Sequence, residues 1–177
     1  MPLDRDTVAH QLVQVEQTIE RVAEQTVHTE AGDFRLMVYR DLMAKELHHA
    51  LVYGAPTAEQ PTLVRVHVKN PLTDVLHWQR DDLAVSAHQA MAMIAKENAG
   101  VLVVLSEPMS SEQLLEQITE QDGHAATKIK QWRQNGAGAQ ILADLGLSRL
   151  RVLGTPRRQV ALAGYGLEVI EYVSLAR

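Results

Sequence analysis

Apolar residues near the start of the chain recur at alternating steps of four and three positions, at Val8, Leu12, Val15, Ile19 and Val22. This spacing is typical of the narrow apolar stripe of a coiled-coil helix. It predicts a helix over Asp4–Gln25, which Asp4 or Asp6 can cap. Three interpretations of this helix remain open. It packs on its own domain, it pairs with a helix of another chain, or it leads out of a preceding domain. We therefore expect an N-terminal helix and linker over residues 1–24, followed by a domain over residues 25–177.

The next part of the chain alternates between apolar and polar positions, which is typical of β-strands. Two alternating runs within Thr26–Asp41 flank Ala31, Gly32 and Asp33, which predicts a hairpin. Two further strands are expected at residues 48–54 and 61–68. Together these four segments predict a mainly antiparallel sheet.

The second half alternates helices and strands. Helical spacing covers residues 82–98, and the apolar run VLVVL that follows is typical of a buried strand. Ser110 or Ser111 can cap a short helix, and the helix GAGAQILADLG is closed by Gly146. Strands RLRVLG and LEVIEYVSL complete the pattern. The expected fold class is α+β, in a single domain with an added N-terminal helix.

Composition narrows the class of protein. The 177 residues suit one domain, and aromatic residues make up only 4% of them, so the core must be mainly aliphatic. A net charge of −5 argues against nucleic acid as a partner. The absence of cysteine excludes disulfides and thiolate metal sites, and it fits a cytoplasmic location. No apolar run approaches the ~20 residues that cross a bilayer, so no membrane association is expected.

Several segments together resemble one enzyme family. GAGAQILADLGLSRLRVLG and GYGLEVIEYVSL, preceded in order by EAGDFRLMVYRD, HHALVYG and LVRVHV, are similar to GTP cyclohydrolase II. The resemblance covers residues 21–175. It implies the fold of that enzyme, which opens the imidazole ring of GTP in the first step of riboflavin synthesis.

The resemblance also implies that the zinc centre of the family is missing. Arg65 and His67 match the Arg-Val-His of the family, but the three positions of its zinc-binding cysteines fall on Asn70, Asp81 and Leu83. Leucine cannot bind a metal, so we expect no metal and no cofactor.

The catalytic Asp-x-Arg of the family survives in part. Arg133 occupies the arginine position, whereas Gln131 replaces the acidic residue and cannot accept a proton at neutral pH. We therefore expect Arg133 to have no catalytic function and the chain to lack GTP cyclohydrolase II activity.

Arginines could still form an anion pocket. The phosphate-binding turn of the family resembles Gly154-Thr155-Pro156-Arg157-Arg158, one residue shorter. Together with Arg65 and His67, Thr155, Arg157 and Arg158 are candidate nucleotide-binding or phosphate-binding residues. The helix start near Gly136-Ala137-Gly138 would add backbone donors. Alternatively, the arginines form surface ion pairs, and the small residues let the helix pack closely.

Histidines suggest one other metal site. His67, His77, Asp81 and His88 lie close together in the sequence, and nitrogen and oxygen ligands can bind zinc. The alternative is that they are polar loop residues and solvated helix positions.

Two functions follow from these expectations. The first is a catalytically inactive GTP cyclohydrolase II-like domain that serves as a structural, dimerising or regulatory module. The resemblance implies a homodimer and a fused or associated 3,4-dihydroxy-2-butanone 4-phosphate synthase domain, to which the N-terminal helix would connect. The alternative is a domain, or an altered hydrolase, that binds GTP or phosphate through the surviving arginines.

Overall fold

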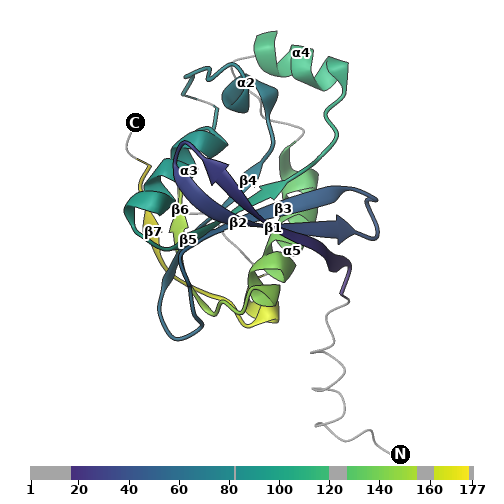
Figure 1. Ribbon diagram of the computed structural model, residues 1–177. Helices are drawn as coiled ribbons and strands as arrows, with labels where there is room; N and C mark the ends of the chain where they lie inside the picture. Colours follow the sequence, from purple (N-terminus) through teal and green to yellow (C-terminus); the bar gives the residue numbers. More distant parts are fainter. Residues whose placement is uncertain (1–16, 82, 120–126, 155–161, 176–177) are drawn as a thin grey trace, which may run out of the picture.

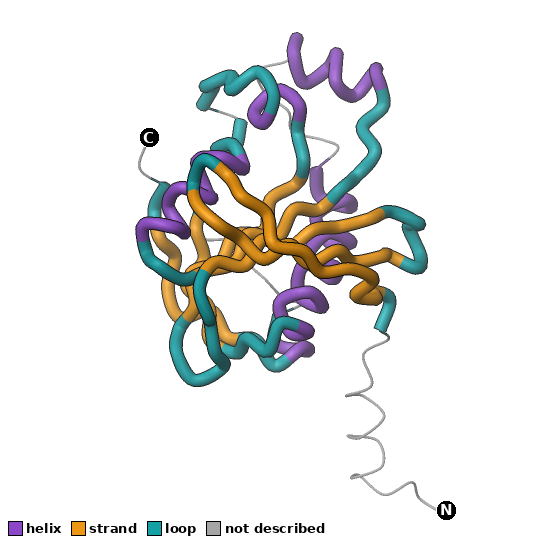
Figure 2. Tube along the Cα trace, in the orientation of Figure 1, coloured by secondary structure: helices purple, strands orange, loops and turns teal. Residues whose placement is uncertain are grey.

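The chain forms a seven-stranded sheet flanked by helices (Figures 1 and 2). The computed structural model describes residues 17–81, 83–119, 127–154 and 162–175, with the backbone alone for 127–135. The strands are β1 (Ile19–Thr29), β2 (Gly32–Asp41), β3 (Leu47–Tyr53), β4 (Thr62–Val68), β5 (Gly100–Leu105), β6 (Arg149–Leu153) and β7 (Glu168–Val173). The helices are α2 (Pro71–Asp74), α3 (Ala87–Lys96), α4 (Ser111–Thr119), α5 (Thr127–Asp144) and the 3-10 turn η1 (Ala163–Tyr165).

The sheet is antiparallel on one side of β5 and parallel on the other. Its order is β1-β2-β3-β5-β4-β6-β7, and β1, β2, β3 and β5 pair antiparallel. β4 pairs parallel with β5 and β6, and β6 pairs parallel with β7. The expectation of a mainly antiparallel sheet is therefore wrong for β4, which lies beside β5 and β6. The crossover from β4 through α2 and α3 to β5 allows this parallel pairing.

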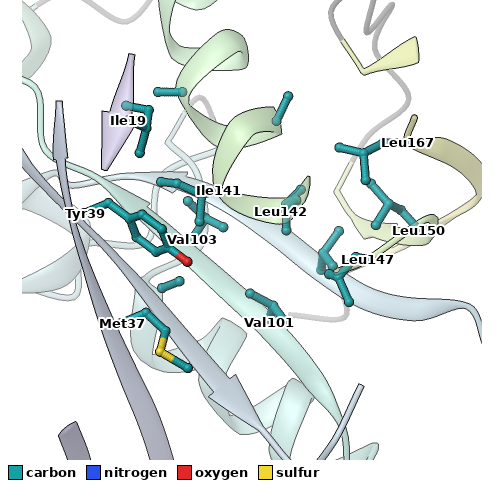
Figure 3. Close-up of a cluster of buried hydrophobic side chains, with 14 of the residues drawn as sticks. Ile19, Met37, Tyr39, Val101, Val103, Ile141, Leu142, Leu147, Leu150 and Leu167 are labelled. Carbon is teal, nitrogen blue, oxygen red and sulfur yellow. The ribbon is translucent and has the colours of Figure 1, made fainter. Parts of the chain in front are cut away.

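Two apolar clusters cover the two faces of the sheet. One joins Ile141 and other residues of α5 to alternate residues of the central strands, including Met37 and Val101 (Figure 3). The other joins α3 to Phe34, Leu63 and Leu102. Because neighbouring residues of a strand point to opposite faces, Val101 and Leu102 contribute to different clusters. On β4 the same alternation directs Leu63 toward α3 and Val64 toward α5.

The predicted helix over Asp4–Gln25 is wrong from Ile19 onward. Residues from Ile19 to Thr29 form β1, and Ile19 lies in the core with 5% of its surface exposed. Val8, Leu12 and Val15 lie outside the described residues, so an N-terminal helix and the division at residue 24 stay predictions.

Most other predicted elements are confirmed. The hairpin joins β1 to β2 through Glu30 and Ala31, and α3 begins after Ser86, whose side chain caps it. Gly146 follows α5 with a φ of 78°, which explains the glycine that closes this helix. In the described part of the chain, no helix is both long and apolar enough to cross a membrane.

A polar cluster fastens β1 to α5. The Tyr39 hydroxyl donates a hydrogen bond to Asp144 at 2.7 Å, and Arg21 forms an ion pair with the same carboxylate at 2.7 Å. Burial raises the pKa of Tyr39, and the Asp144 carboxylate raises it further. The hydroxyl therefore stays protonated and remains a donor to Asp144. The long first strand is thus attached to the helix as well as to β2.

Candidate functional site

Strand β4 carries Arg65 and His67. Of the residues predicted to bind a nucleotide or phosphate, these two have side chains that the structure describes. Arg65 and His67 alternate with Val64 and Val66, which pack toward α5. They therefore share with Leu63 the sheet face that α3 covers. His67 lies near the carboxyl end of β4, where the chain turns into α2. This edge of a parallel sheet is where ligands commonly bind.

His67 is buried against a carboxylate. It is 2% exposed, and its Nε2 lies 3.0 and 2.8 Å from the two carboxylate oxygens of Asp74. Asp74 also accepts hydrogen bonds from the backbone N–H groups of Asn70 and Ala87, each at 2.9 Å. Burial alone would raise the pKa of Asp74, but the hydrogen bonds from His67 and these amides lower it to about 2. The carboxylate is therefore ionised at neutral pH and accepts a proton-bearing Nε2.

The residues at the positions where the resemblance places the cysteines of the family do not fit a zinc ion. Asn70 caps α2: its side-chain oxygen accepts from the Leu72 N–H, and its amide nitrogen donates to Gln117. Leu83 is 6% exposed and has no donor atom. Asn70 is committed to contacts within the protein, and zinc requires about three ligands. The donor set in this part of the chain therefore does not suit the zinc of the family.

The other predicted metal ligands do not converge either. His67 contacts Asp74, and the His88 Nε2 lies 3.0 Å from a carboxylate oxygen of Glu30. The rings of His77 and His88 are 6.1 Å apart between centroids. Among the residues that the structure describes, no three His, Asp or Glu side chains are grouped to hold a metal ion. The four-residue site is therefore not formed.

The arginine positions are brought together only in part. The Arg65 Nη1 donates to the Leu153 carbonyl at 3.0 Å, directly before Gly154. Gly154 has a φ of 138°, and a Cβ there would lie 3.2 Å from that nitrogen. Arg65 is thus fixed at the start of the predicted phosphate turn. Thr155, Arg157 and Arg158 lie outside the described residues, as does the side chain of Arg133, so the anion pocket stays a prediction.

The Gly136-Ala137-Gly138 segment is not a helix start. It lies inside α5, which begins at Thr127, so its backbone N–H groups form hydrogen bonds within the helix. The prediction that these N–H groups would be free to bind an anion is therefore wrong. A Cβ on Gly138 would lie 3.0 Å from Val66 Cγ1, whereas one on Gly136 would meet nothing within 4 Å. This contact favours the alternative interpretation, in which Gly138 lets α5 pack closely on β4.

Sequence reasoning did not predict the structural roles of three residues at this edge of the sheet. They are Asn70 and Asp74, described above, and Arg80. The Arg80 guanidinium lies 4.6 Å from the centre of the Trp78 ring and donates to the Gln117 carbonyl at 2.6 Å. The pair Asn70-Pro71 carried a recognisable signal, since asparagine before proline is typical of a helix start. Asp74 and Arg80 stood out only as ionisable residues after the end of a strand, and Arg80 also matches the resembled family, but neither signal predicted the contacts that they make.

Comparisons with known proteins agree with this architecture. A family model described as GTP cyclohydrolase II matches residues 20–174. The chain is 38% identical over 171 residues to a 3,4-dihydroxy-2-butanone 4-phosphate synthase of Pseudomonas aeruginosa, covering 95% of the chain and 46% of that protein. It is 33% identical over 183 residues to the riboflavin biosynthesis protein RibBA of Chlorobium phaeovibrioides, covering 97% of the chain and 44% of that protein.

A solved structure has the same fold. The crystal structure of RibBX from A. baumannii, a two-domain 3,4-dihydroxy-2-butanone 4-phosphate synthase, is similar with a TM-score of 0.65 and 33% identity. The match covers 95% of the chain and 44% of that protein. The chain thus spans less than half the length of these relatives.

Proposed function

Because the chain belongs to the GTP cyclohydrolase II family, we propose that it is a catalytically inactive domain of a riboflavin biosynthesis protein. It acts as a structural, dimerising or regulatory module. One observation carries this proposal: Asn70 and Leu83, at two of the positions where the resemblance places cysteines, are committed to protein contacts and to burial.

The chemistry of the reaction explains why this observation matters. A hydrolytic zinc activates water and polarises the attacked atom, and each role needs a metal held by the protein. A general base must also accept a proton. Gln131, at the acidic position of the family motif, cannot accept one at neutral pH. Loss of both groups removes the two main chemical contributions to ring opening.

The relatives suggest the partner. Similar proteins named as 3,4-dihydroxy-2-butanone 4-phosphate synthases and as RibBA are more than twice as long as their match to this chain. The domain would therefore act fused to, or associated with, a synthase domain, as a homodimer in the cytoplasm. Its large sheet and two packed faces offer a rigid body for such an assembly.

A formate assay tests the absence of catalysis. The purified chain, incubated with GTP, Mg²⁺ and Zn²⁺, is expected to release no more formate than a protein-free blank. An active member of the family, assayed in parallel, shows that the conditions support turnover. Formate release in proportion to the concentration of this chain would contradict the proposal.

Nucleotide or phosphate binding is the second candidate, and the position of Arg65 beside Gly154 supports it. In this function Arg65, Thr155, Arg157 and Arg158 hold GTP or phosphate, with Arg133 nearby. His67, predicted with them, is 2% exposed and bonded to Asp74, so it would act by fixing β4 beside this site. Calorimetry with GTP separates the two candidates. Micromolar binding that is lost in Arg65→Ala and kept in Arg149→Ala, an exposed arginine on β6, would favour this second function.

A further inference from the structure

The connection between β4 and α3 has few apolar anchors. α2 is only four residues long, and the residues that follow it include the exposed Val75 and Leu76, at 71% and 66% exposure. Leu72 and Leu83 are its buried apolar side chains among the described residues of 69–86. Such a segment buries little apolar surface, so apolar burial alone does not explain how it is held in place.

A single carboxylate lies at the centre of this connection. Asp74 receives hydrogen bonds from His67 on β4, from the Asn70 N–H at the start of α2, and from the Ala87 N–H at the start of α3. Three separate elements are thus joined through one side chain. Hydrogen bonds to an ionised, partly buried acceptor are stronger than neutral ones.

The same network reaches α4. Helix α4 has no buried residue, and Leu115 and Ile118 are 60% and 42% exposed. The Asn70 amide donates to the Gln117 side chain at 2.9 Å, and Arg80 donates to the Gln117 carbonyl. Figure 1 shows α2 and α4 together at the top of the molecule, beyond the strand ends. Polar contacts from the β4–α3 connection therefore hold this helix.

The arrangement has the opposite polarity to a metal centre. In a metal site a cation lies at the centre and lone pairs point inward, whereas here an anion lies at the centre and N–H groups point inward. Both Asp74 oxygens accept two hydrogen bonds of 3.0 Å or less. The His67 Nε2 donates its proton to an acceptor-only carboxylate, so this nitrogen has no free lone pair with which to bind a metal. A cation could enter only by breaking these bonds.

We propose that His67, Asn70, Asp74 and the Ala87 N–H form a metal-independent clasp that orders the β4–α3 connection. The clasp performs, without a cation, the cross-linking that zinc ligands would supply at the same edge of the sheet. Through Asn70 it also fixes α4. This inference concerns the stability of the segment and does not depend on the proposed function.

Hydrogen exchange on the whole chain tests the clasp. In Asp74→Asn, amide exchange in residues 70–79 and 84–90 is expected to accelerate by about tenfold or more, beyond any change in β5. The reason is that a neutral amide oxygen accepts weaker hydrogen bonds than a carboxylate. A tenfold change corresponds to about 1.4 kcal/mol. The control is Asp33→Asn, which makes the same chemical change in an exposed His–Asp pair, His28–Asp33 at 2.7 Å. Exchange in the control is expected to stay within about twofold of the unchanged protein, since exposed pairs contribute little.

A second measurement needs no variant and stays decisive if Asp74→Asn fails to fold. Exchange in residues 70–90 of the unchanged protein is expected to be the same with EDTA, with equimolar Zn²⁺ and with neither. The clasp is ruled out if Asp74→Asn accelerates these segments no more than Asp33→Asn does. It is equally ruled out if EDTA accelerates exchange there or Zn²⁺ slows it.

Discussion

Restoring the three cysteines, as Asn70→Cys with Asp81→Cys and Leu83→Cys, is expected to leave GTP ring opening absent and to destabilise the protein. Loss of the Asn70 cap costs about 1 kcal/mol. Replacing the buried Leu83 by a smaller side chain costs about as much again. The free energy of unfolding should fall by about 2 kcal/mol in total.

Ring opening is expected to stay absent in this triple variant because the residues around the new thiolates would still not support the reaction. The His67 Nε2 would still point its proton at Asp74. Gln131 would still stand at the position of the general base. Urea denaturation measures the stability, and formate release measures the activity. Asp81→Cys alone, at an exposed position, separates the contribution of that position from the contributions of positions 70 and 83.

A triple variant as stable as the unchanged protein would show that positions 70 and 83 are not committed to the fold. A triple variant that bound zinc and released formate from GTP would contradict the account of a lost reaction centre.

Phe34→Ala is expected to lower the free energy of unfolding by about 3–5 kcal/mol, which is a large part of the stability of a domain. Phe34 is the one phenylalanine of the chain and is fully buried. Its ring lies 5.0 Å from that of Tyr53, and it belongs to the cluster that joins α3 to the sheet. Removing the ring leaves a cavity between α3 and strands that cannot close up easily.

Phe34→Leu is the matched control, because it keeps most of the apolar volume and should cost less than about 1.5 kcal/mol. Urea denaturation with an unchanged m-value would assign both effects to stability. A loss below about 1 kcal/mol in Phe34→Ala would mean that the α3 cluster is not the support that its burial indicates.

The strands that pack on both faces were predictable, and the first part of β1, from Ile19 to Gln25, was not. β5 is a run of apolar residues, and its burial makes the pattern unambiguous. In this part only Ile19 is buried, and residues from Glu20 to Gln25 are all exposed, so no alternation marks it as a strand. Backbone pairing with β2 fixes its conformation. Ile19 and Val22 continue the helical spacing of the residues before them, so the sequence pattern predicted a helix where the chain forms a strand.

The parallel position of β4 and the role of Asp74 depend on contacts between distant parts of the chain. No local signal tells whether β4 pairs with β3 or crosses to β5. The Asp74 network needs the amide of Ala87, and α4 meets Asn70 only through Gln117. The missing cysteines, by contrast, could be identified from the sequence alone.

The zinc content of the purified protein tests the central claim most directly. Protein prepared from cells grown with added zinc, and analysed for metal without exposure to chelators, is predicted to hold far less than one zinc ion per chain. One zinc ion per chain, retained through dialysis and released only when the fold is disrupted, would contradict the claim that this domain holds no metal at the edge of its sheet.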